Sequence, residues 1–482
     1  MKTHKKKVIT DSIFLGSGAL ILRLKAIIFI PIIIAYVGLA NYGAFVQILV
    51  NVSLIVPFCT FELGMGFYRY TSKYEESEVE KLSKDYWTVF TAVFIFSVLA
   101  GMFNYLISPA ISKYILSGYS LKSLRLSSLI VICEGLNSVN VKFIQSRKKF
   151  KLFSIYDLLY QLLPYLGFIA GILIKSEIFI GLLIYIIVQT VLMLSLKIYV
   201  ISSLNFSLPS KKIFIRDLKY SWPLLFTVLS GGLLSKIDRY FIGFYLGPES
   251  IGIYNIVYSV CGLLIVFTIP FRKYFATYLP KIWDEGQKDK VREQLKEGLI
   301  YYLIIAIGAF TGIIFLLRPV LDIIFIKNLP QIENFELLIF VTGLGILGLG
   351  VVEFFRRLIE LREQNYLQLI FQLIAVVLNI ILNYFLVKSY GIIGAGIATF
   401  LSYFVVVILC NFYLDMNLDY RFLTKLIRIV IASLPISLWL YFHDSNNIYN
   451  LAVNIVIGAL IYMLSILMLR IVKLKDVKKR LA

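Results

Sequence analysis

Four basic side chains lie in the middle of long apolar stretches, where charged side chains are rare. Arg23 and Lys25 interrupt the first stretch of the chain, and Lys236 and Arg239 interrupt a later one. In a membrane-spanning helix, a central charge costs roughly 2.5–3.5 kcal/mol, so it normally faces a protein interior or a water-filled cavity. Arginine and lysine bind phosphate through charge-assisted hydrogen bonds. These four residues therefore predict a cavity that binds an anion such as a diphosphate.

The same charges also have a purely structural interpretation. Lys236 and Arg239 are three residues apart and share a helix face, whereas Asp238 points about 100° away from its neighbours in sequence. Asp238, or Glu134 from another apolar stretch, could still neutralise Lys236 or Arg239 inside the protein. The sequence leaves both interpretations open, phosphate contact by at least one of the four basic residues or internal ion pairing.

Polar side chains recur at helical spacing inside other apolar stretches. Glu134 and Asn137 are three residues apart, and Asp157 and Gln161 are four apart. Such faces could line a wet passage and bond a moving sugar, or they could bond neighbouring helices, which is worth about 0.6 kcal/mol per contact on average. The predicted polar lining comprises Glu134, Asn137, Asp157, Gln161, Asp238, Gln368, Gln372, Asn379 and Asn383.

Several catalytic chemistries lack their residues in this sequence. Only two histidines are present, so neither a serine triad nor a metal cluster can be assembled. No phosphate-binding P-loop occurs, and the glycine motif at 343–348 lies in an apolar stretch, where close helix packing explains it better. We therefore expect no catalytic residues, no metal and no cofactor. Glu62 and Glu353 lie near the ends of apolar stretches, and we expect ion pairs with Arg69 and Arg356.

The composition indicates which elements position these side chains. Of 482 residues, 59% are hydrophobic and 16% are charged, against about half and a quarter in soluble domains. Apolar runs of about twenty residues match the ~30 Å hydrocarbon core of a bilayer. The predicted fold is an all-α membrane protein with about fourteen transmembrane helices. They lie near 13–37, 43–67, 87–107, 124–141, 153–174, 178–200, 222–246, 251–271, 298–317, 335–353, 366–387, 391–414, 425–442 and 449–470.

The basic residues are distributed unevenly between the two sides of this predicted bundle. The net charge is +20, and Lys and Arg concentrate in alternate loops, for example 69–84 and 272–296. This asymmetry follows the positive-inside rule and places both termini in the cytoplasm, in a multi-pass protein of the cytoplasmic (inner) membrane. It also explains the high pI of about 9.5 without a nucleic-acid partner.

Two predicted outer turns have similar sequences. Gly38–Phe45 and Gly247–Tyr254 each contain a glycine, four residues, a second glycine and then an aromatic residue. With weaker matches elsewhere, they predict a duplicated six-helix unit whose copies have the same orientation. The predicted division is an N-terminal lobe at 1–201, a second lobe at 202–414, and two further helices with a basic tail at 415–482.

The chain resembles the polysaccharide transporters of the multidrug/oligosaccharidyl-lipid/polysaccharide exporter superfamily. The similar segments are 38–43, 237–254, 378–383 and 390–399. The resemblance implies two six-helix lobes around a central cavity that opens alternately to either side. It implies a flippase, not an enzyme, whose cargo is a polyprenyl-pyrophosphate-linked oligosaccharide for O-antigen (lipopolysaccharide), capsule or exopolysaccharide biosynthesis. A coupling proton or sodium ion, contact with membrane lipid, and polymerase or chain-length partners would accompany that role.

Two other functions compete with this one. A multidrug exporter of the same fold would carry small organic cations, which central Arg and Lys side chains disfavour, so the charge of the passage discriminates between the two. A membrane polysaccharide polymerase or glycosyltransferase is expected to have a large loop outside the membrane or an acidic catalytic cluster. The longest predicted loop has only about thirty residues, which leaves no room for a soluble catalytic domain, since domains have about 50 residues or more. The enzyme is therefore the weaker alternative.

Overall fold

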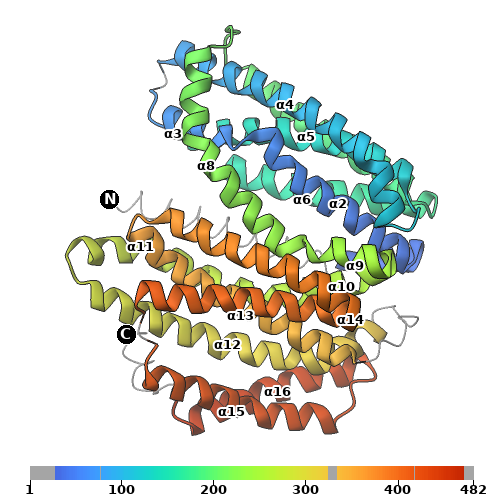
Figure 1. The fold of residues 1–482 in the computed structure, drawn as a ribbon, viewed down its shortest axis with the longest axis vertical. Coiled ribbons are helices and arrows are strands. Elements are labelled where there is room, and N and C mark those ends of the chain that lie inside the picture. The colour runs from blue at the N-terminus through green and yellow to red at the C-terminus, as the bar shows by residue number, and fades with distance from the viewer. Residues whose placement is uncertain (1–27, 76, 324–333, 417, 472–482) are drawn as a thin grey trace. The chain divides into compact units, whose positions relative to one another are not determined.

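A computed structural model describes residues 28–75, 77–323, 334–416 and 418–471, and these residues form helices joined by short turns (Figure 1). An apolar helix covers Ile28–Val37. The helices after it are α2 (Leu39–Thr60), α3 (Leu63–Thr71), α4 (Val79–Tyr114), α5 (Leu121–Ser146), α6 (Phe150–Ile174), α7 (Ile178–Ile201), α8 (Lys211–Lys236), α9 (Asp238–Leu246), α10 (Pro248–Cys261), η1 (Gly262–Thr268), α11 (Ile269–Asp284), α12 (Lys288–Ile323), α13 (Phe335–Leu361), α14 (Asn365–Leu414), α15 (Tyr420–Phe442) and α16 (Ile448–Met468).

The described residues confirm the all-α membrane fold. Eleven of their helices are long and apolar enough to cross a membrane, so the chain is a multi-pass membrane protein. The boundaries differ where helices are interrupted or joined. The predicted helix 43–67 is broken between α2 and α3, because Phe61 and Glu62 adopt positive φ angles of 42° and 53°. The predicted helices 366–387 and 391–414 are both present as the two arms of α14, which meet at a kink where Gly391 has a non-helical φ of 59°.

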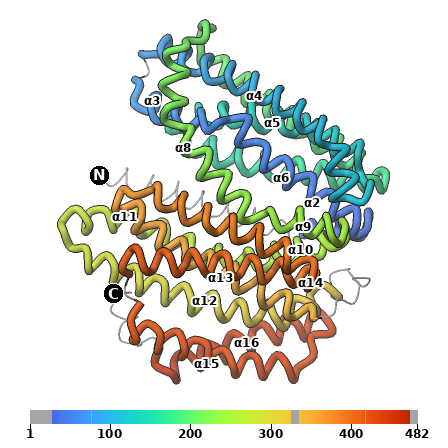
Figure 2. Tube along the Cα trace, viewed as in Figure 1, coloured from blue at the N-terminus to red at the C-terminus, as the bar shows by residue number. Residues whose placement is uncertain are grey.

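The chain forms two compact units, one ending at Asn255 and one beginning at Ile256. In unit 1, α2 packs against α4, α5 and α8 (Figure 2). In the same unit, α6 packs against α7. In unit 2, α13 packs along α14, while α12 packs against α15 and α16. The predicted division at 1–201, 202–414 and 415–482 concerns an ancestral duplication and stays a prediction.

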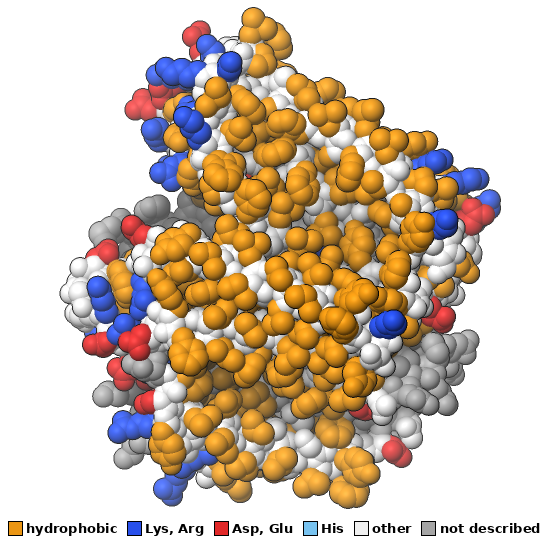
Figure 3. All heavy atoms as spheres, in the orientation of Figure 1, with side chains coloured by type: hydrophobic (Ala, Val, Ile, Leu, Met, Phe, Trp, Pro, Cys, Tyr) orange, Lys and Arg blue, Asp and Glu red, His pale blue; other side chains and the backbone are white. Residues whose placement is uncertain are grey.

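The surface of each unit has the polarity expected of a membrane protein. Apolar side chains cover the sides of the visible helices, while Lys, Arg, Asp and Glu gather toward helix ends (Figure 3). Large apolar side chains are strongly exposed in both units, for example Leu106 and Ile174 in unit 1 and Phe412 and Met468 in unit 2. Since such surfaces are unstable in water, these residues indicate the lipid-facing sides of the helices.

A buried ion cluster fastens the start of α8 to α4 within unit 1. The guanidinium of Arg216 contacts Asp85 Oδ1 at 3.3 Å and donates from Nε to Asp217 Oδ1 at 2.8 Å. Tyr74 donates its hydroxyl hydrogen to Asp85 Oδ2 at 2.8 Å. Both carboxylates are buried, with 2% and 0% exposure. Two acids thus share one arginine, which leaves an excess negative charge in the cluster.

We expect this cluster to make stability depend on pH. Asp217 precedes the apolar part of α8, and burial raises the pKa of its carboxyl to about 6. The folded state therefore binds more protons than the unfolded state at pH between about 4 and 6, so stability should rise as pH falls through that window. Asp217→Asn should remove this dependence, as measured by thermal unfolding in detergent across the window. An unchanged pH dependence in the variant would assign the titration to another group.

Candidate functional site

A cavity of about 610 Å³ lies among α2, α5 and α6 of unit 1. The structure brings together Glu134, Asn137, Asp157 and Gln161 on its wall, although the sequence indicated only that each pair shares a helix face. The other polar residues of the wall are Ser53, Thr60, Glu62, Ser138, Lys142, Tyr160, Tyr165 and Tyr185. Carboxylates, amides and hydroxyls thus share the wall with apolar side chains such as Val52 and Val141, around a space large enough for several sugar-sized groups.

Hydrogen bonds hold the polar side chains of the cavity in place. Gln189 of α7 donates to Glu134 Oε1 at 2.6 Å. The hydroxyl of Tyr156 donates to Asn137 Oδ1 at 2.6 Å, and Gln161 Nε2 donates to Asp157 Oδ1 at 2.9 Å. Each of these bonds orients a side chain without using all of its hydrogen-bonding capacity. The wall can therefore both bond neighbouring helices and offer groups to a bound molecule.

The charges on the cavity wall are mixed. Glu62, Glu134 and Asp157 contribute three carboxyl groups, while Lys142 contributes one amine. The expected ion pair between Glu62 and Arg69 was wrong. The α2–α3 break directs Glu62 to the cavity, where Lys142 is the cation that interacts with it electrostatically.

The expectation for Glu353 was correct. This carboxylate pairs with Arg356 at 3.0 Å and with Arg272 at 3.4 Å. Among the residues that the structure describes, no three His, Cys, Asp or Glu side chains come close enough to hold a metal ion.

Lys236 lies at the edge of this cavity. Its Nζ donates to Ser53 Oγ at 2.7 Å, and Ser53 is part of the cavity wall. Lys236 is half-buried, and within the described ranges no carboxylate approaches its Nζ within 4.0 Å. Its charged neighbour is another cation, Arg239. Because a partly buried charge without a counter-ion is unfavourable, Lys236 is well placed to bind an anion.

Arg239 has a different environment from Lys236. It is 4% exposed and contacts Asp238 Oδ1 at 3.2 Å, while Asp238 also accepts a hydrogen bond from Tyr254. The guanidinium further donates to Asn255 Oδ1 at 3.2 and 3.3 Å and to the carbonyl of Ser235 at 2.9 Å. Neither Arg239 nor Asp238 is among the residues lining the cavity of unit 1. Both residues are buried in a polar network that joins α9 to α10.

The remaining predicted residues lie elsewhere. Asn379 and Asn383 of unit 2 are fully buried, and Asn383 Nδ2 donates to Asn379 Oδ1 at 3.0 Å. Gln368 and Gln372 are half-buried on the same helix, α14. Arg23 and Lys25 lie outside the described residues. Their predicted contact with phosphate therefore stays a prediction.

The two similar turns adopt the same backbone conformation and contact each other within unit 1. Gly38 and Gly247 have φ angles of 80° and 83° with extended ψ, a region that favours glycine. A Cβ on Gly43 would overlap the carbonyl oxygen of Pro248, and a Cβ on Gly252 would lie 3.0 Å from that of Leu39. Each glycine thus packs against the first residue of the other helix.

Sequence reasoning missed several residues of the cavity. Ser53 and Lys142 belong to α2 and α5, and Tyr160, Tyr165 and Tyr185 contribute aromatic walls. The spacing of Glu134, Ser138 and Lys142 at four-residue intervals was a signal that could have added two of them. Nothing in the sequence indicated Ser53, because its role depends on where the long Lys236 side chain reaches.

Comparison with known proteins identifies the family of the chain. A sequence profile described as polysaccharide biosynthesis protein matches residues 8–274, and a MatE profile matches residues 223–385. One relative is the probable low-salt glycan biosynthesis flippase Agl15 of Haloferax volcanii, 27% identical over 197 residues that make up 40% of each chain. Another is the probable flippase AglR of the same organism, 26% identical over 35% of each chain. The matches thus span less than half the length of these relatives.

Solved structures share the fold over most of the chain. The lipid II flippase MurJ in its inward closed conformation matches with a TM-score of 0.73 and 17% identity, covering 94% of this chain and 98% of that one. The MATE multidrug transporter DinF-BH matches with a TM-score of 0.58 and 18% identity, covering 86% and 96%. These likenesses show the fold alone, and that fold serves both flippases and drug exporters.

Proposed function

Because the chain belongs to the polysaccharide biosynthesis protein family, within the multidrug/oligosaccharidyl-lipid/polysaccharide exporter superfamily, we propose that it is a flippase for a polyprenyl-pyrophosphate-linked oligosaccharide. The observation that carries the proposal is Lys236, a half-buried cation without a carboxylate partner in the described chain, at the edge of a cavity with polar groups on its wall. The names of the two relatives from Haloferax volcanii, both probable flippases, support the same substrate class.

In this proposal, the residues divide the work by their chemistry. Lys236 contacts the diphosphate, with Arg23 and Lys25, which lie outside the described residues, as further predicted contacts. Asn137, Gln161 and the other polar groups of the cavity exchange hydrogen bonds with the sugar hydroxyls as the oligosaccharide passes. Arg239, which is fully engaged by Asp238 and Asn255, positions α9 beside α10.

Transport by alternating access requires one end of the passage to close while the other opens. We propose that the contact between the two similar turns is the closed outer end, since both turns are predicted to face outward. The glycines at 43 and 252 allow the backbones of α2 and α10 to touch directly. The coupling ion would be a proton or sodium, for which the carboxylates of Glu134 and Asp157 are the candidate ligands.

The orientation and the polymer are further parts of the proposal. We expect the protein to lie in the cytoplasmic membrane with both termini in the cytoplasm. A reporter fused after residue 482 that is active on the outer side would contradict this orientation. The glycan would serve a surface polymer such as O-antigen, capsule or exopolysaccharide. A polymerase or chain-length protein would then receive it on the outer side.

One observation favours the second candidate, a multidrug exporter. Three carboxylates against one lysine on the cavity wall would attract an organic cation. We prefer the flippase because the two relatives from Haloferax volcanii are probable flippases and because, among the described residues, the Lys236 amine bonds only to the hydroxyl of Ser53.

We expect the purified protein in liposomes to move a fluorescent polyprenyl-pyrophosphate oligosaccharide between leaflets. A membrane-impermeant reagent destroys the fluorescence of the outer leaflet, and the fraction of fluorescence lost over time measures how much glycan lipid has moved there. Protein-free liposomes are the control. In them, the glycan lipid should move between leaflets very slowly, because the polar sugar cannot cross the hydrocarbon core. Uptake of a fluorescent organic cation without glycan movement would assign the protein to the drug exporters. Growth of the glycan chain or release of nucleotide would assign it to the enzymes.

A further inference from the structure

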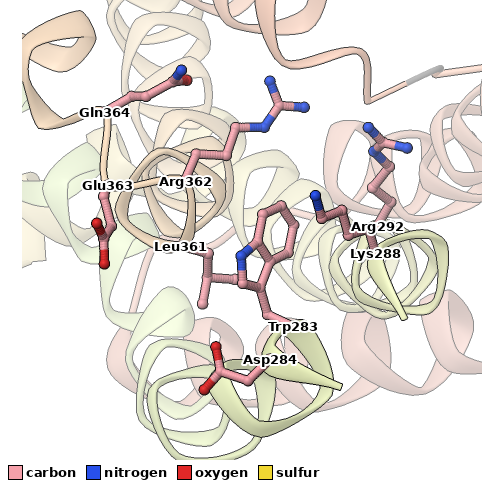
Figure 4. Close-up of a pocket in the computed structure, with 8 residues that line it drawn as sticks. All are labelled: Trp283, Asp284, Lys288, Arg292, Leu361, Arg362, Glu363 and Gln364. Carbon is pink, nitrogen blue, oxygen red and sulfur yellow. The ribbon is translucent and has the colours of Figure 1, made fainter. Parts of the chain in front are cut away.

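A second pocket, of about 470 Å³, lies at helix ends within unit 2 and is separate from the cavity described above (Figure 4). Its walls come from the end of α11, the start of α12, and the turn that joins α13 to α14. These segments belong to predicted cytoplasmic loops. The pocket therefore lies where the helices meet the inner surface of the membrane.

Three cations converge on this pocket. The side-chain nitrogens of Lys288, Arg292 and Arg362 gather on one side of the ring of Trp283 (Figure 4). Lys288 Nζ lies 5.3 Å from the centre of that ring. Arg362 is fixed, because it donates to the carbonyl of Leu414 at 2.7 Å at the end of α14. Burial and the neighbouring Arg292 lower the pKa of the Arg362 guanidinium, and the carboxylate of Asp415 opposes this shift only in part.

The acids near the pocket compensate these cations only weakly. Asp284 and Glu363 belong to the wall, but their carboxylates point away from the three cations (Figure 4). Asp289 pairs with Arg292 at 2.8 Å, but its side chain is 98% exposed, so the pair contributes little. Among the described residues, no carboxylate comes within 4.0 Å of Lys288 Nζ. A counter-anion is therefore the missing component.

Buried polar atoms around the pocket support the same conclusion. Within the described ranges, Arg292 Nε is buried without a hydrogen-bond partner. The helix α14 begins beside the pocket, and its N-cap residue Gln364 makes no side-chain capping bond. The N-terminus of a long helix favours an anion, because its first N–H groups are unpaired and its dipole is positive there. Three cations and a helix N-terminus form a phosphate-binding arrangement.

The neighbouring surface is suited to a lipid. Tyr366 and Phe412 lie near the two ends of α14 and are 57% and 81% exposed, and Trp283 is an aromatic residue at the predicted interface. Aromatic side chains are enriched at that level of a membrane. We propose that the pocket binds the phosphate headgroup of an anionic glycerophospholipid of the inner leaflet, with its acyl chains along the exposed aromatic surface. This lipid is distinct from the transported glycan lipid.

Trp283 provides a direct test, because it is one of four tryptophans. A variant with Trp87→Phe, Trp222→Phe and Trp439→Phe leaves Trp283 as the only tryptophan. We reconstitute this variant into phosphatidylcholine vesicles. At equal mole fraction, brominated phosphatidylglycerol should quench the fluorescence of Trp283 more strongly than brominated phosphatidylcholine does. Equal quenching by the two lipids would overturn the proposal. The readout requires no transport, so it is independent of the flippase assay.

Charge variants identify the residues responsible. Lys288→Gln with Arg292→Gln should reduce the preference for phosphatidylglycerol roughly 30-fold, at about 1 kcal/mol for each cation near an anionic surface. The matched control is Lys281→Gln, a change at an 83%-exposed lysine of α11 outside the pocket, which should retain the preference. Arg362 is left intact because it caps α14. Full preference in the double variant would overturn the proposal.

Two competitors identify the source of the phosphate. Inorganic phosphate in the buffer should not relieve quenching by brominated phosphatidylglycerol, and polyprenyl diphosphate should compete no better than phosphatidylglycerol itself. Relief by inorganic phosphate would assign the pocket to a soluble anion. Stronger competition by polyprenyl diphosphate would assign it to the transported lipid. Either result would overturn a glycerophospholipid site.

Discussion

Lys236→Gln should abolish transport of the lipid-linked glycan and leave the amount of folded protein in the membrane unchanged. Lys236 is half-buried, bonds only to the hydroxyl of Ser53 at 2.7 Å, and has no carboxylate within 4.0 Å among the described residues. Removing this charge therefore breaks no ion pair, and it makes insertion of α8 easier. If the amine binds the diphosphate, its loss should cost about 1.5–3 kcal/mol, which is roughly a 10- to 150-fold loss in affinity.

Variants at the same position separate charge from shape. Lys236→Glu should be worse than Lys236→Gln, because it places a negative charge beside the diphosphate. Lys236→Arg should retain part of the activity, because the positive charge survives while the geometry of its hydrogen bonds changes. The measurement is glycan movement in liposomes at equal protein content. Full transport by Lys236→Gln would rule out the phosphate contact.

Arg239 is the matched control for a buried cation with a partner. Arg239→Gln leaves Asp238 buried without its counter-charge, and breaking such a pair costs about 3–5 kcal/mol. We therefore expect this variant to accumulate poorly in the membrane, which Lys236→Gln should not do. Adding Asp238→Asn should restore accumulation. Normal accumulation of Arg239→Gln alone would show that the pair is dispensable for folding.

The number and placement of helices could be predicted from the sequence because bilayer thickness sets the length of each apolar run. The spacing of Glu134 and Asn137, and of Asp157 and Gln161, placed each pair on one helix face, and those faces meet at one cavity. Spacing within a helix could not show that α5 and α6 share this cavity. That depends on packing between helices, which leaves no regular pattern in the sequence.

The partner of Arg239 illustrates a second limit. Helix geometry placed Asp238 about 100° away from Arg239, so the sequence left open whether the two residues pair. In the structure, α8 and α9 meet in a tighter turn at Ile237, whose carbonyl accepts from Tyr240 only three residues later. The long arginine side chain reaches Asp238 Oδ1 at 3.2 Å and also bonds to Asn255 of α10. At a helix junction, a long flexible side chain can thus reach a residue that helix geometry places on another face.

Gly43→Ala should stop transport by separating the two similar turns. An added Cβ would overlap the carbonyl oxygen of Pro248 and lie 3.0 Å from the backbone nitrogen of Gly252. These are backbone atoms that cannot rotate away, so α2 and α10 must move apart. Overpacking of this kind costs about 1–3 kcal/mol, and each 1.4 kcal/mol changes an equilibrium about tenfold. The conformation with this contact formed should therefore become rare.

Labelling measures this separation directly. Ser250 lies between Pro248 and Gly252, and among the described residues its hydroxyl bonds only to the carbonyl of Leu246. With Ser250→Cys as the probe, a membrane-impermeant maleimide added from outside should react faster when Gly43→Ala is present, since the four native cysteines are buried. Gly232→Ala is the matched control, because the nearest atom to its added Cβ would be a leucine side-chain carbon at 3.4 Å. That change should alter neither labelling nor transport. Because alternating access needs the outer end to close, faster labelling in Gly43→Ala must be accompanied by loss of transport. Faster labelling with full transport would show that the two turns are not the outer gate.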